Sequence, residues 1–456
     1  MALTFLACCQ AGQPESPTAK TNNLPLDLGT RKVGVDWERF LGPTGNSVSS
    51  EKGLLTSWPK QGPNIVWIRP MGAGYSLPAI SKGRAFLFDR VGNQARMVCC
   101  HSETGKELWE QRFATQYEDL YGYSNGPRCY PVVDQDRVYF FGPEGMLYCL
   151  KAVDGTVLWK ADTFGDFGVV QNFFGVGSTP AVHEDLLLVP VGGSPKGSNQ
   201  VDFTELKGNG SGIVAFDKFT GKVRYKITDE LASYSSPTIT TIQGKKWGFH
   251  LARSGLIGFD PGSGKVEFQF PWRSRILESV NAANPVVIDN RVFISETYGP
   301  GAALIEVQPG SGKVIWDDAG KVRDKSMQCH WNTPIHVNGY LYGCSGRHKS
   351  NAELRCIELA TGKVQWSVPG MTRSSLLLAD GHFICQDEEG GLHLIKVNPE
   401  KFELLSSVQL KYPAGMKREG EPLLLEPCWS APILSHGLLY LRGRDCVACL
   451  EVIPTR

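Results

Sequence analysis

The chain has 456 residues and a formal net charge of +1, with 41% hydrophobic and 20% charged residues. This composition is that of a soluble globular protein. A charge so close to zero excludes the basic footprint of a nucleic-acid-binding protein, so no nucleic-acid partner is expected. No apolar run approaches the ~20 residues that a membrane-spanning helix needs.

The N-terminus has the features of an export signal. Residues 1–9 form a short apolar run that ends in Cys8 and Cys9, as in the second half of a bacterial lipoprotein signal. A signal of this kind begins with a basic segment, which is missing here. The hypothesis of an export signal therefore includes a true start codon upstream of Met1. Residues 10–35 are polar without apolar periodicity and are predicted to form a disordered tether. The sequence thus predicts an exported protein, periplasmic or held at a membrane by a lipid anchor; the alternative is an unstructured N-terminus without a role in export.

A six-residue pattern with glycine at its second position and an aromatic residue at its sixth recurs along the chain. Its copies are 104–109, 154–159, 220–225, 263–268, 311–316 and 361–366. Successive glycines are 50, 66, 43, 48 and 50 residues apart. This is the period of a four-stranded propeller blade and not of a helical solenoid. The step of 66 reflects a polar insertion at 192–212, which is interpreted either as a binding loop or as neutral variation.

An inner strand that begins with small or polar residues precedes each turn. Eight such segments occur, at 76–80, 129–133, 178–182, 235–239, 283–287, 332–336, 373–377 and 430–434. We therefore predict an all-β fold, an eight-bladed β-propeller of four-stranded antiparallel blades that forms one domain over residues 36–456.

The last blade lacks its outer strand, since the chain ends after three strands. Residues 62–68 supply the missing strand from the other end of the chain, so we predict that they complete this blade and remove its open edge. The recurring aromatic residues then pack between blades. The tryptophans predicted to do so are Trp67, Trp109, Trp159, Trp316 and Trp366.

The Gly-x-x-x-Trp turn and the apolar strand before it resemble the repeat of pyrroloquinoline-quinone (PQQ) type propellers. That group includes quinoprotein alcohol dehydrogenases and the propeller lipoprotein of the outer-membrane assembly machinery. The opening of the chain, from Trp37-Glu38-Arg39-Phe40-Leu41-Gly42-Pro43 to Gly74-Tyr75-Ser76, resembles the start of exported bacterial PQQ-like propeller proteins. The resemblance covers residues 37–453. It implies the quinoprotein alcohol dehydrogenase-like propeller fold far more strongly than any activity.

The chemistry of a quinoprotein dehydrogenase is not readable in the sequence. Such an enzyme needs calcium ligands, a catalytic Asp and arginine near the quinone, and it carries a vicinal disulfide. Cys99 and Cys100 are adjacent, but both occupy ordinary strand positions of the repeat, where neighbouring side chains point to opposite faces. The calcium ligands and the base have no recognisable counterparts. No cofactor and no metal site is therefore expected; PQQ and calcium belong to the alternative function.

The segments that lead into the inner strands converge near the central channel and carry polar and aromatic side chains. Such a set suits a small polar ligand, a sugar or a peptide at the funnel mouth. The candidate ligand-binding residues are Tyr123, Asn125, Arg128, Tyr130, Asn172, Tyr234, Glu278, Asn281, Asn284, His330, Trp331, Arg373 and Trp429. Taken alone, each residue is more typical of a turn or a cap, and only the convergence of the set favours a binding role.

The function predicted from these features is that of an exported, non-catalytic binding or scaffolding module. It would present one face of the propeller to a protein, a peptide or a glycan, and a monomer is expected. The alternative is a haem-free, PQQ- and calcium-dependent alcohol or sugar dehydrogenase. Covalent c-type haem is excluded because no Cys-x-x-Cys-His occurs.

Overall fold

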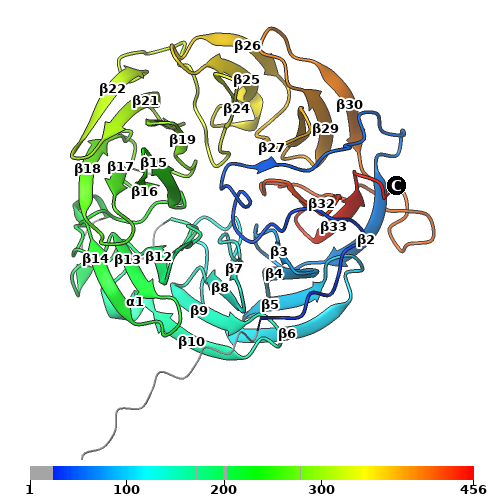
Figure 1. Ribbon diagram of the computed structural model, residues 1–456, viewed down its shortest axis with the longest axis horizontal. Helices are drawn as coiled ribbons and strands as arrows, with labels where there is room; N and C mark the ends of the chain where they lie inside the picture. Colours follow the sequence, from blue (N-terminus) through cyan, green and yellow to red (C-terminus); the bar gives the residue numbers. More distant parts are fainter. Residues whose placement is uncertain (1–23, 171–172, 199–202, 278, 456) are drawn as a thin grey trace, which may run out of the picture.

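The computed structural model describes residues 24–170, 173–198, 203–277 and 279–455. These residues form eight sheets that surround a central axis, as Figure 1 shows. Each sheet has four antiparallel strands, and one carries an additional short strand. The predicted eight-bladed propeller is confirmed. The segment predicted as a signal, 1–9, lies outside the described residues.

The strands follow the chain blade by blade, from the axis to the rim. The first four blades are β3 (Ala79–Ser81), β4 (Arg84–Val91), β5 (Gln94–His101), β6 (Glu107–Ala114); β7 (Val132–Asp134), β8 (Arg137–Phe141), β9 (Met146–Lys151), β10 (Val157–Asp162); β11 (Ala181–His183), β12 (Leu186–Pro190), β13 (Ile213–Asp217), β14 (Val223–Ile227); and β15 (Thr238–Ile242), β16 (Lys245–Leu251), β17 (Gly255–Phe259), β18 (Val266–Pro271).

The remaining four blades complete the ring. They are β19 (Val286–Ile288), β20 (Arg291–Glu296), β21 (Gly301–Gln308), β22 (Ser311–Asp317); β23 (Ile335–Val337), β24 (Tyr340–Ser345), β25 (Glu353–Glu358), β26 (Val364–Pro369); β27 (Ser375–Ala379), β28 (His382–Gln386), β29 (Gly391–Lys396), β30 (Leu404–Gln409); and β31 (Ile433–Ser435), β32 (Leu438–Arg442), β33 (Cys446–Glu451), β2 (Asn64–Pro70).

The glycine and the aromatic residue of the sequence repeat form one contact between neighbouring blades. The Trp67 indole donates to the Ser102 carbonyl at 2.8 Å and lies over Gly105, which has a φ of 67°. A Cβ at Gly105 would lie 2.9 Å from the Trp67 ring, so only glycine fits. The same bond recurs around the ring: Trp109 donates to Ala152, Trp159 to Lys218, Trp316 to Leu359 and Trp366 to Asn398.

The hydrophobic core is divided into clusters that lie between consecutive blades. Phe86 and Phe88 of the first blade, for example, pack against Phe140 and Leu150 of the second. The largest cluster joins the seventh, eighth and first blades, and includes Leu392, Leu439 and Leu87 among its members. The packing thus continues across the point where the two ends of the chain meet.

An N-terminal strand closes the last blade, as the sequence predicts. β2 pairs antiparallel with β33, with Asn64 opposite Glu451 and Pro70 opposite Cys446. In Figure 1 this blue strand lies at the rim beside the red C-terminal strands. The pairing covers Asn64–Pro70, two residues further along the chain than the predicted 62–68.

A second N-terminal segment, residues 37–49, crosses the channel inside the ring. Trp37 forms a bridge with Ile80 of β3, and the Glu38 carbonyl accepts a hydrogen bond from Val133 of β7. The segment ends in β1 (Val48–Ser49), which pairs parallel with β27. This fifth strand is not predicted from the sequence, because two residues are too few to show a period.

Part of the predicted tether lies against the propeller. Residues 10–23 are outside the part of the chain that the structure describes, and residues 24–35 run along the first and last blades. Arg31 pairs with Glu103 and, at 3.2 Å, with Glu451, and the Lys32 carbonyl lies 3.0 Å from His436 Nδ1. The domain boundary at residue 36 stays a prediction.

Few helical turns interrupt the strands in the described residues: α1 (Thr163–Phe167), η2 (Phe203–Glu205) and η3 (Lys349–Asn351). The described part of the 192–212 insertion packs on α1, where Asn209 donates to the carbonyl oxygens of Phe167 and Ser194. Among the described residues, none of the helices has the length and apolar character to span a membrane.

Candidate functional site

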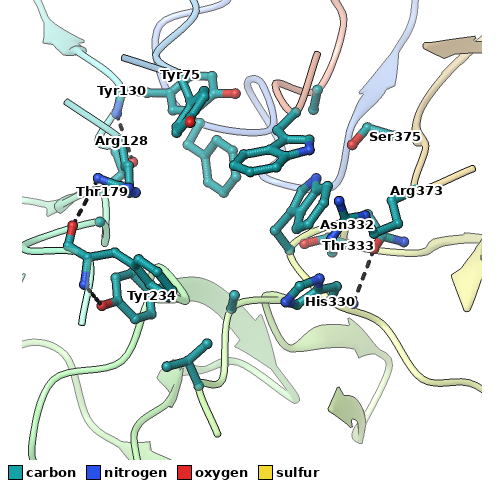
Figure 2. A pocket seen from close by; sticks show the side chains of 18 of the residues that line it. Tyr75, Arg128, Tyr130, Thr179, Tyr234, His330, Asn332, Thr333, Arg373 and Ser375 are labelled. Carbon is teal, nitrogen blue, oxygen red and sulfur yellow. Dashed lines mark hydrogen bonds between the residues drawn. The ribbon is translucent and has the colours of Figure 1, made fainter. Parts of the chain in front are cut away.

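A cavity of about 360 Å³ lies on the propeller axis, between the connections that lead into the inner strands. Figure 2 shows Arg128, Thr179 and Tyr234 on one side of it and His330 and Arg373 on the other. Its volume is at the lower end of the range for small-molecule sites, which is about 300–1,000 Å³.

The cavity has a closed end and an open end. Phe40, Leu41 and Ser47 of the segment that crosses the channel line the closed end, where Leu41 is only 4% exposed. Phe40 also lines a smaller pocket with Arg39 and Gly45, so this segment separates the two spaces. Tyr121 and Tyr123 are 48% and 59% exposed and mark the open end.

Aromatic rings line the cavity in a continuous series of contacts, which we call the aromatic wall. Neighbouring ring centroids along it are 4.6–5.9 Å apart, within the range of favourable aromatic pairs. The wall consists, in order, of Tyr298, His330, Trp331, Trp429, Tyr123, Phe174 and Tyr234. Tyr298 follows the second strand of its blade, whereas the others precede inner strands.

Two of the three arginines at the cavity are held in place by buried carboxylates behind it. Arg128 pairs with Asp119 at 2.5 Å, and Arg373 pairs with Glu388 through two nitrogen atoms, with Nη2 at 2.8 Å from Oε1. Arg373 lies over the rings of Trp331 and Trp429, at 4.7 and 5.6 Å from their centroids. These guanidinium planes therefore extend the aromatic wall.

The third arginine, Arg347, differs from the other two. Its guanidinium lies over the Tyr298 ring at 4.5 Å and is half-buried. Within the described part of the chain, its side chain has no ion pair and donates no hydrogen bond. Arg347 is thus the cavity cation whose charge is available to a ligand.

Burial keeps three titratable rings at the cavity, those of His330, Tyr75 and Tyr298, neutral at physiological pH. Burial, together with the charges of Arg373 and Arg347, lowers the pKa of His330 to about 3. Burial raises the pKa of Tyr75 and of Tyr298 to about 12. The His330 Nε2 atom lies 3.0 Å from the Tyr298 hydroxyl. A neutral imidazole and protonated phenols can exchange hydrogen bonds with a ligand but are poor proton carriers near pH 7.

Three polar atoms of wall residues have no hydrogen-bond partner in the structure and are covered by neighbouring atoms. They are the indole nitrogens of Trp331 and Trp429 and Nδ1 of His330. A buried polar atom without a partner costs about 1–3 kcal/mol, so such atoms are normally satisfied by a water or a ligand.

The structure brings together eight of the thirteen candidate residues that were chosen from the sequence. These eight line the cavity: Tyr123, Arg128, Tyr130, Tyr234, His330, Trp331, Arg373 and Trp429. Asn172 and Glu278 lie outside the described residues.

The other three candidates hold the backbone and do not line the cavity. The Asn281 amide donates to the Ala252 carbonyl at 2.7 Å, and the Asn125 side-chain oxygen accepts from the Asp119 amide at 2.8 Å. Asn284 accepts from the Ser236 amide at 2.7 Å and lines only the smaller pocket. One side-chain atom of each asparagine is thus held by the backbone, and none of the three lines the axial cavity.

Several cavity residues are absent from the sequence-based set. Tyr298 and Arg347 follow β20 and β24, in the connections between second and third strands, from which no candidate was drawn. Tyr75, Tyr121 and Phe174 lie within a few residues of inner strands or of named candidates. Position beside an inner strand is a signal that could have found these three, whereas Tyr298 and Arg347 needed the fold.

The donor atoms at this cavity do not suit calcium. Calcium takes six to eight oxygen ligands, including carboxylates. Among the described residues that line the cavity, none carries a carboxylate, and no group of three His, Cys, Asp or Glu side chains elsewhere in them could hold a metal ion. Cys99 and Cys100 are free, buried residues of strand β5, where both pair with β4. The residues present therefore do not fit the calcium-bound quinone of a dehydrogenase.

Comparisons with known proteins point to one family. A family model described as outer membrane protein assembly factor BamB matches residues 93–368. A protein of that name from Yersinia pestis is 20% identical over 371 residues, which are 76% of this chain and 81% of its own length.

Solved structures show the same fold at low sequence identity. The structure of BamB from Moraxella catarrhalis is 11% identical, with a TM-score of 0.53, over 85% of this chain and 97% of its own. A quinohemoprotein alcohol dehydrogenase from Comamonas testosteroni is also 11% identical, with a TM-score of 0.59, over 92% of this chain and 81% of its own. At this identity, the two structures show that the fold is shared, and the likeness says nothing about activity.

Proposed function

The chain belongs to the family whose model is described as outer membrane protein assembly factor BamB, and from this premise we propose that it is an exported, non-catalytic binding module that serves the assembly of outer-membrane proteins. It acts in the periplasm at the outer membrane, held there by a lipid on Cys8 or Cys9. Its partner is a protein or a peptide that contacts the face of the propeller at which the cavity opens.

The observation that carries this proposal is the character of the axial cavity. Its wall is aromatic, burial keeps His330 and Tyr298 neutral, and its lining among the described residues has no carboxylate. General acid–base catalysis needs an accessible group with a pKa near the working pH. His330 and Tyr298 do not provide one, and Glu296, whose pKa burial raises to about 7, is 1% exposed and does not line the cavity. An aromatic surface around a shallow opening is instead typical of recognition sites.

The rim of the cavity adds an exposed apolar surface suited to a partner. Leu120, Tyr121 and Tyr123 lie in one connection and are 70%, 48% and 59% exposed. Aromatic residues of this kind are enriched where proteins bind one another. The dehydrogenase alternative gains no support from the cavity, because the residues there do not fit calcium; the absence of a cofactor stays a prediction.

Complementation in the bacterium that carries the gene tests the proposal. Depletion of the chain is expected to lower the amounts of outer-membrane proteins, and the wild-type chain should restore them. Tyr123→Asp places a charge on the rim and should fail to restore them, at equal expression. The matched control is Val322→Asp, at a position that is 93% exposed and does not line the cavity. Unchanged outer-membrane proteins after depletion would refute the proposed role.

A further inference from the structure

The aromatic wall excludes cationic ligands, although aromatic cages commonly bind them. A cation is attracted to the face of an aromatic ring when no other cation is near. Here Arg347, Arg373 and Arg128 already lie over rings of the cavity, at 4.5–5.5 Å from the Tyr298, Trp331 and Phe174 centroids. Asp119 and Glu388 balance Arg128 and Arg373, but Arg347 forms no ion pair among the described residues, so a second cation would meet repulsion from Arg347.

Several polar side chains of the lining are used within the protein, which disfavours a ligand rich in hydroxyl groups. The Thr179 and Thr333 hydroxyls accept hydrogen bonds from the amides of Tyr130 and Asn284. The Asn332 amide donates to the Cys344 carbonyl at 2.8 Å. A sugar that loses its hydration in the cavity would find few partners for its hydroxyls, and each unpaired hydroxyl would weaken binding.

Arg347 supplies the attraction that an anionic group needs. It is half-buried beside the exposed His348 near the open end, and its guanidinium forms no ion pair among the described residues. A guanidinium binds a carboxylate through two parallel hydrogen bonds.

We propose that the axial cavity binds a compact aromatic carboxylate, with its ring against Trp331 and Trp429 and its carboxylate paired with Arg347. The volume of about 360 Å³ suits one or two rings. Arg347 is the one guanidinium at the cavity without an ion pair, so it suits a ligand with a single carboxylate. A ligand with several carboxylates would need further cations. This inference rests on the proposed binding function and names the chemistry of the group bound.

Titration of the full-length chain with four small probes tests the ligand class. The probes are 3-phenylpropionate, its neutral amide, the cationic 3-phenylpropylamine and glucuronate, followed by tryptophan fluorescence and calorimetry. The carboxylate should saturate the protein with a Kd below about 1 mM. The other three should bind at least about tenfold more weakly. Equal binding of the amide or the amine, stronger binding of glucuronate, or no saturation by 3-phenylpropionate at about 10 mM would overturn the proposal.

Variants of Arg347 locate the carboxylate. Arg347→Met keeps the length of the side chain and removes its charge, and should weaken 3-phenylpropionate at least about tenfold while leaving the amide unchanged. Arg347→Lys retains the charge and should recover most of the affinity. Arg323→Met makes the same change at an exposed residue outside the cavity lining and should have no effect. An Arg347→Met protein that binds like the wild type would overturn the assignment.

Peptides separate the two sources of such a ligand, the end of a polypeptide and a free aromatic acid. One peptide ends in phenylalanine with a free carboxylate, and the other is its amidated form. If only the free-carboxylate peptide competes with 3-phenylpropionate, the ligand is a chain terminus. If neither peptide competes, the ligand is a free acid. Both outcomes support the ligand class. Since these titrations use purified protein, their failure is distinct from unchanged outer-membrane proteins after depletion, which refutes only the assembly role.

Discussion

At the scale of single residues, Glu296 is a buried carboxyl beneath the cavity whose ionisation the fold resists. It ends β20, is 1% exposed, and accepts hydrogen bonds from Ser279 Oγ at 2.7 Å and from the Gly299 amide at 3.0 Å. Burial raises its pKa to about 7, although these bonds and the charge of Arg347 act in the opposite direction. Its ordinary pKa in the unfolded chain is near 4.5.

The raised pKa of Glu296 predicts a loss of stability as the pH rises. An acid whose pKa is higher in the folded state binds its proton more tightly there. Its contribution to the free energy of unfolding is therefore complete below pH 4.5 and is lost as the pH rises through about 7. The difference between the folded and unfolded pKa values corresponds to about 3 kcal/mol. Urea unfolding at pH 5, 6, 7 and 8 should therefore show a steeper decline in the free energy of unfolding for the wild type than for Glu296→Gln.

His436 provides the internal reference for this comparison. Its pKa is raised, first by its hydrogen bond to Asp36, so it too contributes stability that is lost as the pH rises, but equally in both proteins. Parallel pH profiles for the wild type and Glu296→Gln would contradict the assigned pKa of Glu296.

At the scale of elements, the turn of one blade and the outer strand of its neighbour are stabilised by the glycine–tryptophan contact. Gly155 has a φ of 74°, and a Cβ there would lie 2.6 Å from the Trp109 ring. The Trp109 indole donates to the Ala152 carbonyl of the same turn at 3.1 Å. The glycine is therefore required twice, by the left-handed backbone and by the ring above it.

Alanine substitution separates these two requirements. Gly244 has a φ of 79°, and a Cβ there would have no atom within 4 Å, so Gly244→Ala should cost about 1–2 kcal/mol for the backbone conformation alone. Gly155→Ala should cost about 1–3 kcal/mol more, because the methyl group displaces Trp109. Denaturant unfolding of both variants measures the difference. Equal costs would show that the tryptophan contact does not constrain the turn.

At the scale of the whole molecule, the N-terminal region both completes the ring and closes the cavity. β2 covers the edge of β33, and residues 37–49 cross the channel to reach β27. The Glu51 carboxylate adds to this closure by accepting from the amides of Val35, His436 and Gly437. Ring stability and the shape of the site therefore depend on the same forty or so residues.

Removal of this region should destabilise the entire propeller. A chain that lacks residues 36–70 loses β2, exposes the edge of β33 and uncovers the core cluster that joins the last and first blades. Its melting temperature should fall by at least about 10 °C, and it should bind apolar dyes, as measured by thermal unfolding. A chain that lacks only residues 1–23, the predicted signal and the first part of the predicted tether, should melt like the full protein. A truncation of 36–70 that melts like the full chain would contradict closure by β2.

The fold and the site differ in how far local sequence specifies them. The glycine and tryptophan of each turn recur because each blade must meet its neighbour in the same way, so the repeat alone determined the propeller, its blade number and its closing strand. Strand β1 left no pattern because it is two residues long and depends on β27 for its pairing. The site has no repeat, since each blade contributes a different side chain to it.

Which candidate side chains meet was decided by the tertiary structure. Trp331 and Trp429 are almost a hundred residues apart in sequence, and their ring centroids are 4.9 Å apart. Asn281 also precedes an inner strand, yet its side-chain amide donates to backbone carbonyls and does not reach the cavity. Sequence by itself determined the scaffold, because repeated contacts between neighbours leave a periodic trace. The cavity was decided by the closing of the ring, because only closure places residues from distant blades around one axis.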